Sequence, residues 1–370
     1  MILSNEQEKA IKIASDNFKH GVDITTIAGY AGSGKTTLIS YFIEQNDLMD
    51  KTHFCTYTGK AALVLQQKGL PATTIHKLIY QTIFNHKTGE FYFMKKPKLD
   101  SNIKLIVIDE ISMVPRDLLR DLQRYGIPII ALGDPGQLEP IGDTDNNLLK
   151  KPDIFLTEIH RQALDSSIIR LSMDIREGKP LKLTYNDPYV KIIKKEEVHF
   201  GVLDWADQIL VSRNATRHGL NDHMREELGY SGEFPMVGEK VICLRNYWDK
   251  SNSDGYALTN GATGTVKRAK TLSHYFYPNN TVIDFLPDFS DGEFSQLKLN
   301  GKVLKREKVT YQKGKKLFDF DYGYAITTHK SQGSQFPKVF IYNETLPHTD
   351  HKRLLYTAAT RAEDKLVIAI

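Results

Sequence analysis

A glycine-rich segment at residues 29–36 (GYAGSGKT) has the residue types and spacing that phosphate binding requires. It follows a β-branched run at 22–28 and precedes a helical stretch at 37–45, which disfavours the alternative of an ordinary glycine-rich turn. Glycines let backbone N–H groups converge on phosphate oxygens, and a helix start adds a favourable dipole. We expect Lys35 to neutralise the β- and γ-phosphates and Thr36 to ligate Mg²⁺. The predicted nucleotide-binding residues are Gly29, Tyr30, Ala31, Gly32, Ser33, Gly34, Lys35 and Thr36.

A second segment supplies the carboxylates that nucleotide hydrolysis needs. The apolar run at 105–108 predicts a buried strand, and it ends directly in Asp109 and Glu110. We expect Asp109 to hold the metal and Glu110 to orient the attacking water. An acidic pair at a helix N-terminus would look similar by itself. Together with the segment at 29–36, the pair predicts hydrolysis of ATP or GTP.

The elements that position these residues alternate between strand-like and helix-like stretches. An amphipathic helix is expected at 3–18, strands at 53–57, 104–109 and 127–132, and a helix at 60–67. Short strands alternating with helices predict a parallel sheet covered on both faces. Residues 80–100 break this rhythm and read as a β-hairpin with its turn at 87–89.

The pattern changes after residue 142. Helical stretches at 166–177 and 215–228, with strands at 208–211, 339–342 and 366–370, predict a second α/β domain. Short β-rich runs replace the helical periodicity at 236–320, and we interpret this part as an inserted β-barrel. It carries 14 Lys and Arg against 9 Asp and Glu.

Composition narrows the class of protein without identifying it. The chain has 370 residues and a net charge of +4, from 49 basic and 45 acidic residues. Its two cysteines cannot make a disulfide framework or a zinc site, and no apolar run approaches the roughly 20 residues of a membrane span. The N-terminal residues lack the pattern of a secretion signal. We therefore expect a soluble cytoplasmic protein of two or three domains.

The remaining motifs resemble those of superfamily 1 helicases. Residues 132–140 (LGDPGQLEP) resemble motif III, 324–333 (YAITTHKSQG) motif V, and 354–362 (LLYTAATRA) motif VI. Residues 3–7 are similar to the adenine-reading Q motif, 56–62 and 74–77 to motifs Ia and Ib, and 156–161 to motif IV. The order is that of the family, and the layout is most similar to the RecD/Dda-like branch.

This resemblance implies an α/β fold class with two RecA-like P-loop domains. Residues 1–150 would form the first motor domain, with a β-hairpin pin at 80–100. Residues 151–235 and 321–370 would form the second, with an SH3-like β-barrel inserted at 236–320.

The resemblance also implies catalytic roles. These fall to Lys35, Glu110, Gln137, Arg161 and Arg361, and Gln7 would contact the adenine. Gln137 lies after a predicted strand, where its amide could sense the γ-phosphate or could stabilise a turn. Arg161 and Arg361 lie far along the chain from residues 29–36, as expected of arginine fingers that enter the site when two domains close.

The expected DNA contacts are hydroxyls, amides and aromatic rings. Phosphate-binding candidates are Thr58, Gly59, Thr74, His76, Thr328, His329, Ser331 and Gln332. Helix caps at Thr74, Thr328 and Ser331, and a core histidine at His76, are the alternatives. Phe91 and Phe93 beside a lysine-rich run could form a wedge that parts two strands, or could pack the hairpin onto its domain.

The predicted function is that of an ATP-dependent DNA helicase, with ATP and Mg²⁺ as cofactors. We expect a monomer that translocates on single-stranded DNA and unwinds forked duplex DNA, in the cytoplasm of a bacterial or phage-infected cell. The resemblance implies 5′-to-3′ movement, with a single-strand-binding protein or a replisome component as a further partner. The alternatives are an ATPase subunit of a recombination or nuclease complex, a nucleotide kinase, and a non-catalytic single-stranded DNA-binding module.

Overall fold

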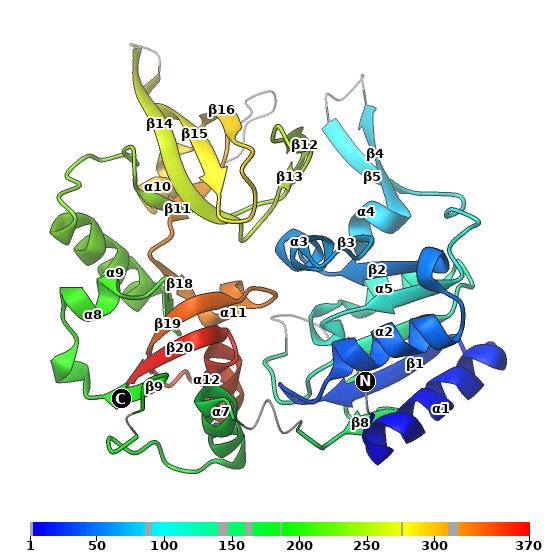
Figure 1. The fold of residues 1–370 in the computed structure, drawn as a ribbon. Coiled ribbons are helices and arrows are strands. Elements are labelled where there is room, and N and C mark those ends of the chain that lie inside the picture. The colour runs from blue at the N-terminus through cyan, green and yellow to red at the C-terminus, as the bar shows by residue number, and fades with distance from the viewer. Residues whose placement is uncertain are drawn as a thin grey trace.

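The computed structural model describes residues 3–85, 90–139, 147–159, 165–185, 187–274, 277–309 and 317–370. Two α/β lobes lie side by side, and two small antiparallel β structures lie above them in Figure 1. We use "first lobe" for residues 3–156 outside 80–95, and "second lobe" for residues 167–227 and 325–370. The "β insert" is residues 240–322.

The first lobe is built on a parallel sheet of six strands. Their order is β3 (Ala72–Thr74), β2 (Thr52–Thr56), β6 (Leu105–Ile108), β7 (Ile129–Gly133), β1 (Ile24–Gly29) and β8 (Ile154–Leu156). Helices α1 (Asn5–Lys19), α2 (Lys35–Gln45) and α3 (Gly59–Gln67) cover one face, and α4 (Ile75–Ile79) and α5 (Arg116–Gln123) cover the other. Short 3₁₀ helices occupy η1 (Met49–Lys51), η2 (Ile111–Met113) and η3 (Asn147–Leu149).

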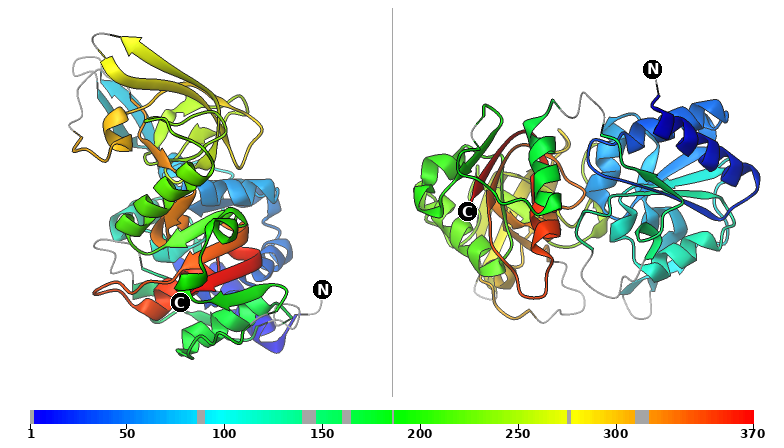
Figure 2. Two further views of the ribbon diagram at one scale, coloured as in Figure 1. Left: turned by 90° about the vertical axis from the view of Figure 1, so that its left-hand side faces the viewer. Right: turned by 90° about the horizontal axis from the view of Figure 1, so that it is seen from below.

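The second lobe repeats this plan with five parallel strands. Their order is β18 (Ala325–Thr327), β10 (Gln208–Val211), β19 (Phe336–Tyr342), β20 (Ala362–Ala369) and β9 (Val190–Ile193). Helices α7 (Ser167–Glu177) and α12 (His351–Ala359) pack on one face, and α8 (Phe200–Asp204) and α9 (Asn214–Glu227) on the other. The lobe also contains α11 (Thr328–Ser331), and η4 (Lys195–Glu197) follows β9. Figures 1 and 2 show α7 and α12 on the side that faces the first lobe.

The remaining strands are antiparallel. In the first half of the chain, β4 (Tyr80–Asn85) pairs with β5 (Glu90–Lys95). In the β insert the order is β16 (Phe294–Lys298), β15 (Tyr277–Pro287), β14 (Thr263–His274), β11 (Lys240–Cys243) and β17 (Phe320–Tyr322). A separate pair joins β12 (Tyr247–Ser251) to β13 (Ala257–Leu258), and α10 (Gly301–Leu304) is a single turn.

Local sequence explains why these elements form. The Leu-Ile-Val-Ile run of β6 is buried at every position, as expected of a central parallel strand. Helix α1 begins at a capping box, in which Ser4 and Gln7 bond each other's backbone amides. The β insert has an aromatic core that includes Phe285, Phe294 and Phe320. Each unit therefore buries a core of its own.

Two sheets extend past the predicted domain boundaries. Strand β8 lies beyond residue 150 and pairs with β1, so the first sheet ends at Leu156. Strand β17 pairs with β11, so the sheet of the β insert ends at Tyr322 rather than at residue 320. In both places the strand pairing, which depends on distant partners, decides where the sheet stops.

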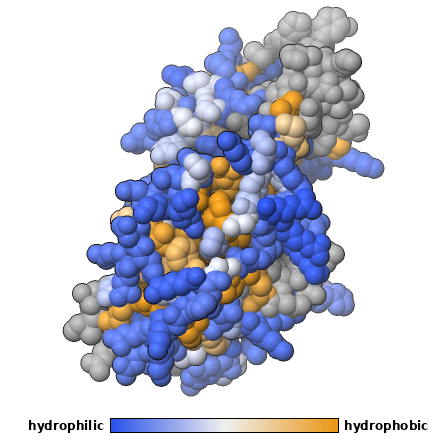
Figure 3. Space-filling view, turned by 90° about the vertical axis from the view of Figure 1, so that its right-hand side faces the viewer, coloured by the Kyte–Doolittle hydropathy of each residue, from blue (hydrophilic) through white to orange (hydrophobic). Residues whose placement is uncertain are grey.

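The first lobe has a cavity on its outer surface. Figure 3 shows apolar side chains on this face gathered among hydrophilic ones. A cavity of about 640 Å³ in this lobe is lined partly by Ile43, Phe54, Leu70 and Ile103. None of the predicted site residues lines it. No helix in the described part of the chain is long and apolar enough to cross a membrane.

Lys60 lies where the first lobe, the second lobe and the β insert meet. Its Nζ donates a hydrogen bond to Thr263 Oγ1 of the insert at 3.2 Å and lies 4.6 Å from the ring centroid of Phe336. Burial lowers the pKa of Lys60 to about 8, although the nearby charge of Asp288 opposes the shift. The surroundings of the Lys60 side chain therefore favour the neutral amine over the charged ammonium.

Replacing Lys60 by Met should change how stability depends on pH. The folded-state pKa of about 8 lies below the ordinary value of 10.5, so between these values the unfolded chain binds a proton that the folded chain does not. Wild-type stability should therefore rise relative to Lys60→Met, by roughly 2.5 kcal/mol between pH 7 and pH 10. Urea unfolding of both proteins at the two pH values measures this. Parallel pH profiles would contradict the assignment.

Candidate active site

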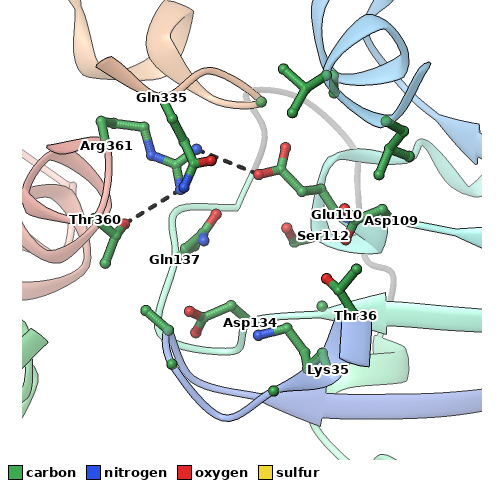
Figure 4. Close-up of a pocket in the computed structure, with 18 of the residues that line it drawn as sticks. Lys35, Thr36, Asp109, Glu110, Ser112, Asp134, Gln137, Gln335, Thr360 and Arg361 are labelled. Atoms are coloured by element: carbon green, nitrogen blue, oxygen red, sulfur yellow. Dashed lines mark hydrogen bonds and ion pairs between the residues drawn. The ribbon is translucent and has the colours of Figure 1, made fainter. Parts of the chain in front are cut away.

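A cavity of about 400 Å³ lies between the two lobes, and residues of both lobes line it. The first lobe contributes the loop after β1 and the segments that follow β6 and β7. These three strands are neighbours in the sheet, in the order β6, β7, β1, so their carboxyl ends meet at one edge. The second lobe contributes Gly333 and Gln335, which precede β19, and Thr360 and Arg361, which precede β20 (Figure 4).

The loop between β1 and α2 has the conformation of a phosphate cradle. Gly34 adopts φ +75° at the N-cap of α2, and no side chain caps the helix, which leaves its first amides for a ligand. A Cβ at Gly29 would lie 2.5 Å from Ser33 Oγ and 3.1 Å from Leu156 Cβ, so a larger residue would be crowded at this position. Ser33 Oγ itself is buried and has no hydrogen-bond partner among the described residues. The unused donors fit a polyphosphate.

Lys35 lies within this cradle. Its Nζ donates to the carbonyl oxygens of Gly29 at 2.7 Å and Tyr30 at 3.1 Å. Burial lowers the pKa of Lys35, and the charges of Asp134 and Asp109 act in the opposite direction. Figure 4 shows the Lys35 ammonium beside the Asp134 carboxylate. The negative charge of a bound phosphate group would stabilise the Lys35 ammonium against the effect of burial.

The two carboxylates after β6 lie on the same cavity. Asp109 Oδ1 accepts the backbone N–H of Glu110 at 2.9 Å. Glu110 has φ +54°, a left-handed conformation that non-glycine residues adopt rarely and that concentrates at functional sites. Burial raises the pKa of both carboxyl groups; nearby Lys35 lowers that of Asp109, and Arg361 lowers that of Glu110.

A divalent cation would find few protein ligands here, which is what Mg²⁺ bound to a nucleotide requires. No cluster of three or more His, Cys, Asp or Glu side chains suited to a metal occurs in the described ranges. Thr36 and Asp109 both line the cavity. Mg²⁺ is usually held by one or two carboxylates, substrate phosphates and water, so this donor set fits it.

Arg361 crosses from the second lobe to the first. Its Nη1 lies 3.4 Å from Glu110 Oε1, and its side chain is 5% exposed. The guanidinium also donates to the carbonyl oxygens of Thr357 and Ser334, both at 3.2 Å. Glu110 Oε2 is buried and has no hydrogen-bond partner in the described part of the chain. Arg361 is thus fixed by its own lobe and presented to the other lobe's carboxylate.

Other predicted nucleotide contacts are placed less directly. Gln137 lines the cavity (Figure 4). Gln7 does not line it, and its Oε1 accepts the Ser4 amide. The guanidinium of Arg176 lies 3.6 Å from the ring centroid of Tyr30. Arg161 lies outside the described residues.

Several predicted DNA-contact residues use their side chains within the protein. Thr58 and Thr74 are N-caps, accepting the amides of Ala61 and Lys77, so Thr74 fills the cap alternative considered for it. Thr328 Oγ1 donates to the carbonyl of Val211, Ser331 Oγ to that of Thr328, and Gln332 Nε2 to that of Leu138. These three side chains are buried.

Of the other predicted contacts, Gly59 lies against the β insert, and Phe91 and Phe93 lie on β5. A Cβ at Gly59 would lie 2.3 Å from Thr259 of the insert. His76 lies between the rings of Tyr57 and Tyr80, and burial lowers its pKa and that of His329. Phe93 is 54% exposed, while the side chain of Phe91 lies outside the described set.

The cavity also contains residues that sequence reasoning did not assign. They include the polar residues Ser112, Asp134, Gln335 and Thr360. Asp134 had a usable signal, because it directly follows a buried strand, as Asp109 does. Thr360 lies within the segment at 354–362 that resembles motif VI, although no role was assigned to it, whereas Gln335 had no signal and reaches the cavity only through the packing of the second lobe.

Family models match both halves of this chain. A model described as an AAA domain matches residues 2–192, and one described as a UvrD-like helicase C-terminal domain matches residues 322–369. The RecD2 DNA helicase of Deinococcus radiodurans is 26% identical, over 94% of this chain and 47% of the relative. The Dda helicase of phage T4 is 23% identical, over 97% of each chain. The chain thus spans about half of RecD2 and nearly all of Dda.

Solved structures show the same fold. A structure of Pif1 helicases at forked double-stranded DNA has a TM-score of 0.59 at 22% identity, over 100% of this chain and 92% of that one. A Bacteroides Pif1 bound to single-stranded DNA has a TM-score of 0.55, also at 22% identity, over the same shares. The chain belongs to the superfamily 1 helicases of the RecD and Dda type, and its fold is similar to that of Pif1 helicases. Its enzyme class is ATP-dependent DNA helicase.

Gly333 offers a test of how closely the lobes meet. It has φ +74°, and a Cβ there would lie 2.8 Å from Thr58 Oγ1 and 3.2 Å from Glu110 Oε2. Gly333→Ala should therefore separate the lobes and lower the ATPase kcat about tenfold or more. Gly261→Ala is the matched control, because φ is +86° there and the nearest atom is 3.9 Å away. Both variants carry backbone strain, so equal losses of activity would show that crowding at the cleft is unimportant.

Proposed function

We propose that this chain couples ATP hydrolysis at the cavity between its lobes to 5′-to-3′ movement along single-stranded DNA, and that it separates the strands of a forked duplex. One observation carries the proposal. Glu110 of the first lobe and Arg361 of the second approach to 3.4 Å beside the loop that holds Lys35. Because the two residues come from different lobes, the rate of hydrolysis at such a site depends on how the lobes are arranged. A motor requires this coupling between hydrolysis and lobe movement.

The proposed roles follow from position. The backbone amides of residues 32 and 34–36 and the Lys35 ammonium hold the triphosphate, and Thr36 and Asp109 would hold Mg²⁺. When bound, Mg²⁺ would neutralise the charge that develops on the transferred phosphoryl group. Glu110 orients the attacking water and accepts its proton, which requires an ionised carboxylate. Arg361 favours that ionised form, against the effect of burial.

Gln137 and the arginines complete the proposed reaction site. Gln137 contacts the γ-phosphate from the loop after β7. The Arg361 guanidinium stabilises negative charge in the transition state, as arginine fingers do. Arg161 is proposed as a second finger, and Gln7 as the adenine contact, on the resemblance of their motifs alone.

Movement would follow from opening and closing of the cleft. The closed arrangement is held by contacts that cross it, such as Arg353 to Glu139 at 2.8 Å and Gln332 Nε2 to the carbonyl of Leu138 at 3.0 Å. Opening must break them, so the distance between the two lobes' grips on DNA would change with each hydrolysis. Thr58, on the first lobe, lies against Gly333, on the second, which puts two proposed DNA-contact segments side by side.

The DNA-facing parts are proposed by analogy with the relatives. RecD2 and Dda are named as DNA helicases, and Pif1 structures are described with single-stranded and forked DNA. We propose the same partners here, the β4–β5 pair as the pin, and the β insert as an SH3-like barrel. The exposed ring of Phe93 on β5 suits a wedge. The proposal further includes a monomer that works with a single-strand-binding protein or a replisome component.

Lys35→Ala should abolish DNA-stimulated ATP hydrolysis, because no other cation of the phosphate loop can replace the buried ammonium. Lys51→Ala is the control, since Lys51 pairs with Asp47 on the surface. A coupled phosphate-release assay with single-stranded DNA measures both. Wild-type turnover by Lys35→Ala would refute the assignment of the site.

Duplexes with a single 5′ or 3′ tail test the direction of movement. The proposal predicts that wild-type protein unwinds the 5′-tailed duplex in the presence of ATP, and that Lys35→Ala unwinds neither. Strand separation is followed by loss of energy transfer between two dyes at the duplex end. Preferred unwinding of the 3′-tailed duplex would overturn the polarity, and unwinding of neither would overturn the helicase function.

A further inference from the structure

Tyr356 is a second-lobe side chain whose hydroxyl is bonded to the first lobe. It lies on α12, five positions before Arg361, and is 1% exposed. Its hydroxyl donates to Asp134 Oδ2 at 2.7 Å and accepts the backbone N–H of Ala31, in the phosphate loop, at 3.0 Å. One hydroxyl therefore joins the second lobe to two separate parts of the candidate active site.

These bonds depend on closure of the lobes. Among the described residues, both hydrogen-bond partners of the Tyr356 hydroxyl belong to the first lobe, so separating the lobes breaks both bonds. Burial raises the pKa of Tyr356, and the negative charge of Asp134 raises it further, so the hydroxyl keeps the proton that it donates. A hydroxyl that is buried without partners is costly, so among closed arrangements those that bring Asp134 and Ala31 within reach of Tyr356 are favoured.

Asp134, which Tyr356 holds in place, is itself hydrogen-bonded to the loop that carries Gln137. Its Oδ1 accepts the backbone N–H of Gly136 at 2.8 Å, and its carbonyl accepts that of Gln137 at 3.2 Å. A Cβ at Gly136 would lie 3.0 Å from the Tyr356 ring, so the glycine lets the ring lie against the loop.

The far end of the same loop is also anchored by the second lobe. Leu138 donates its N–H to Thr357 Oγ1 at 2.9 Å, and its carbonyl accepts from Gln332 Nε2. Tyr356 and Thr357 are consecutive residues, so α12 holds residues 134 to 138 at both ends. Gln137 lies between the two anchors and faces the cavity.

We propose that Tyr356 is a positioning residue for ATP hydrolysis, whose hydroxyl fixes Asp134 and the phosphate loop when the lobes close and so places Gln137 for the reaction. This inference rests on the proposed function. It assigns to the start of motif VI a role separate from that of Arg361. Tyr356 acts through the loop at 134–138 and needs no contact with the nucleotide.

Tyr356→Phe tests this by removing one oxygen atom and keeping the ring. The expected result is a loss of about tenfold in the DNA-stimulated kcat, with a KM for ATP within about twofold of wild type. Tyr322→Phe is the matched control, because Tyr322 is also buried, in the β insert, and its hydroxyl bonds the carbonyl of Glu233. It should keep wild-type kcat and KM. A Tyr356→Phe variant with wild-type kcat, or with a kcat loss equal to that of Tyr322→Phe, overturns the proposal.

A second comparison asks whether Tyr356 acts through the loop. In a Gln137→Ala background, adding Tyr356→Phe should lower kcat by less than about threefold, because the group being positioned is already gone. A full further loss of about tenfold would show that Tyr356 acts independently of Gln137 and would overturn the assigned route. Wild-type protein is assayed first. If it fails to hydrolyse ATP with single-stranded DNA present, the proposed function fails, whatever the variants do.

Discussion

The contact between Glu110 and Arg361 is the interaction on which the rest of the site depends. Burial alone raises the pKa of Asp109 and Glu110 and lowers that of Lys35, so each charge is unfavourable without its neighbours. The two carboxylates, Asp109 and Glu110, and the two cations, Lys35 and Arg361, stabilise one another's charged forms. Removing one would leave an uncompensated charge in a poorly solvated cleft, which is far more costly than losing a surface ion pair. A site of this kind is complete only when both lobes contribute.

The fold supplies this arrangement through the direction of its strands. In the first lobe, the adjacent strands β6, β7 and β1 end at one edge of a parallel sheet and deliver Asp109, Asp134 and the phosphate loop. The second lobe presents the opposite ends of its strands, because Gln335 and Arg361 directly precede β19 and β20. The two sheets therefore meet with opposite strand ends, and the cavity between them combines the uncapped amides at the start of α2 with a buried guanidinium. Neither lobe alone provides both the amides and the guanidinium.

The sequence was sufficient to predict the elements and residues whose signals are local. The turn between a strand and a helix at residues 29–36, the strand before Asp109 and the alternation of strands and helices depend on neighbours in the chain, and the structure has these elements where they were expected. Phosphate binding by the turn stays a prediction. The extent of the first sheet past residue 150 was not predictable, because β8 is too short to have its own signal and is defined by pairing with β1. The bond from Tyr356 to Asp134 joins positions 222 residues apart and has no local signature. Gln332 could be recognised as part of a motif, but its bond to Leu138 depends on how the lobes pack.

Single-turnover ATP hydrolysis by Arg361→Lys, in the presence of single-stranded DNA, tests the central claim most directly. The variant keeps a positive charge beside Glu110 but loses the planar guanidinium that reaches across the cleft. If the second lobe completes the site, the hydrolysis rate should fall by a factor on the order of 10³, while the affinity for ATP stays within about threefold of wild type. Normal hydrolysis, or normal turnover with a lost affinity for ATP, would show that Arg361 holds the lobes together without taking part in the reaction.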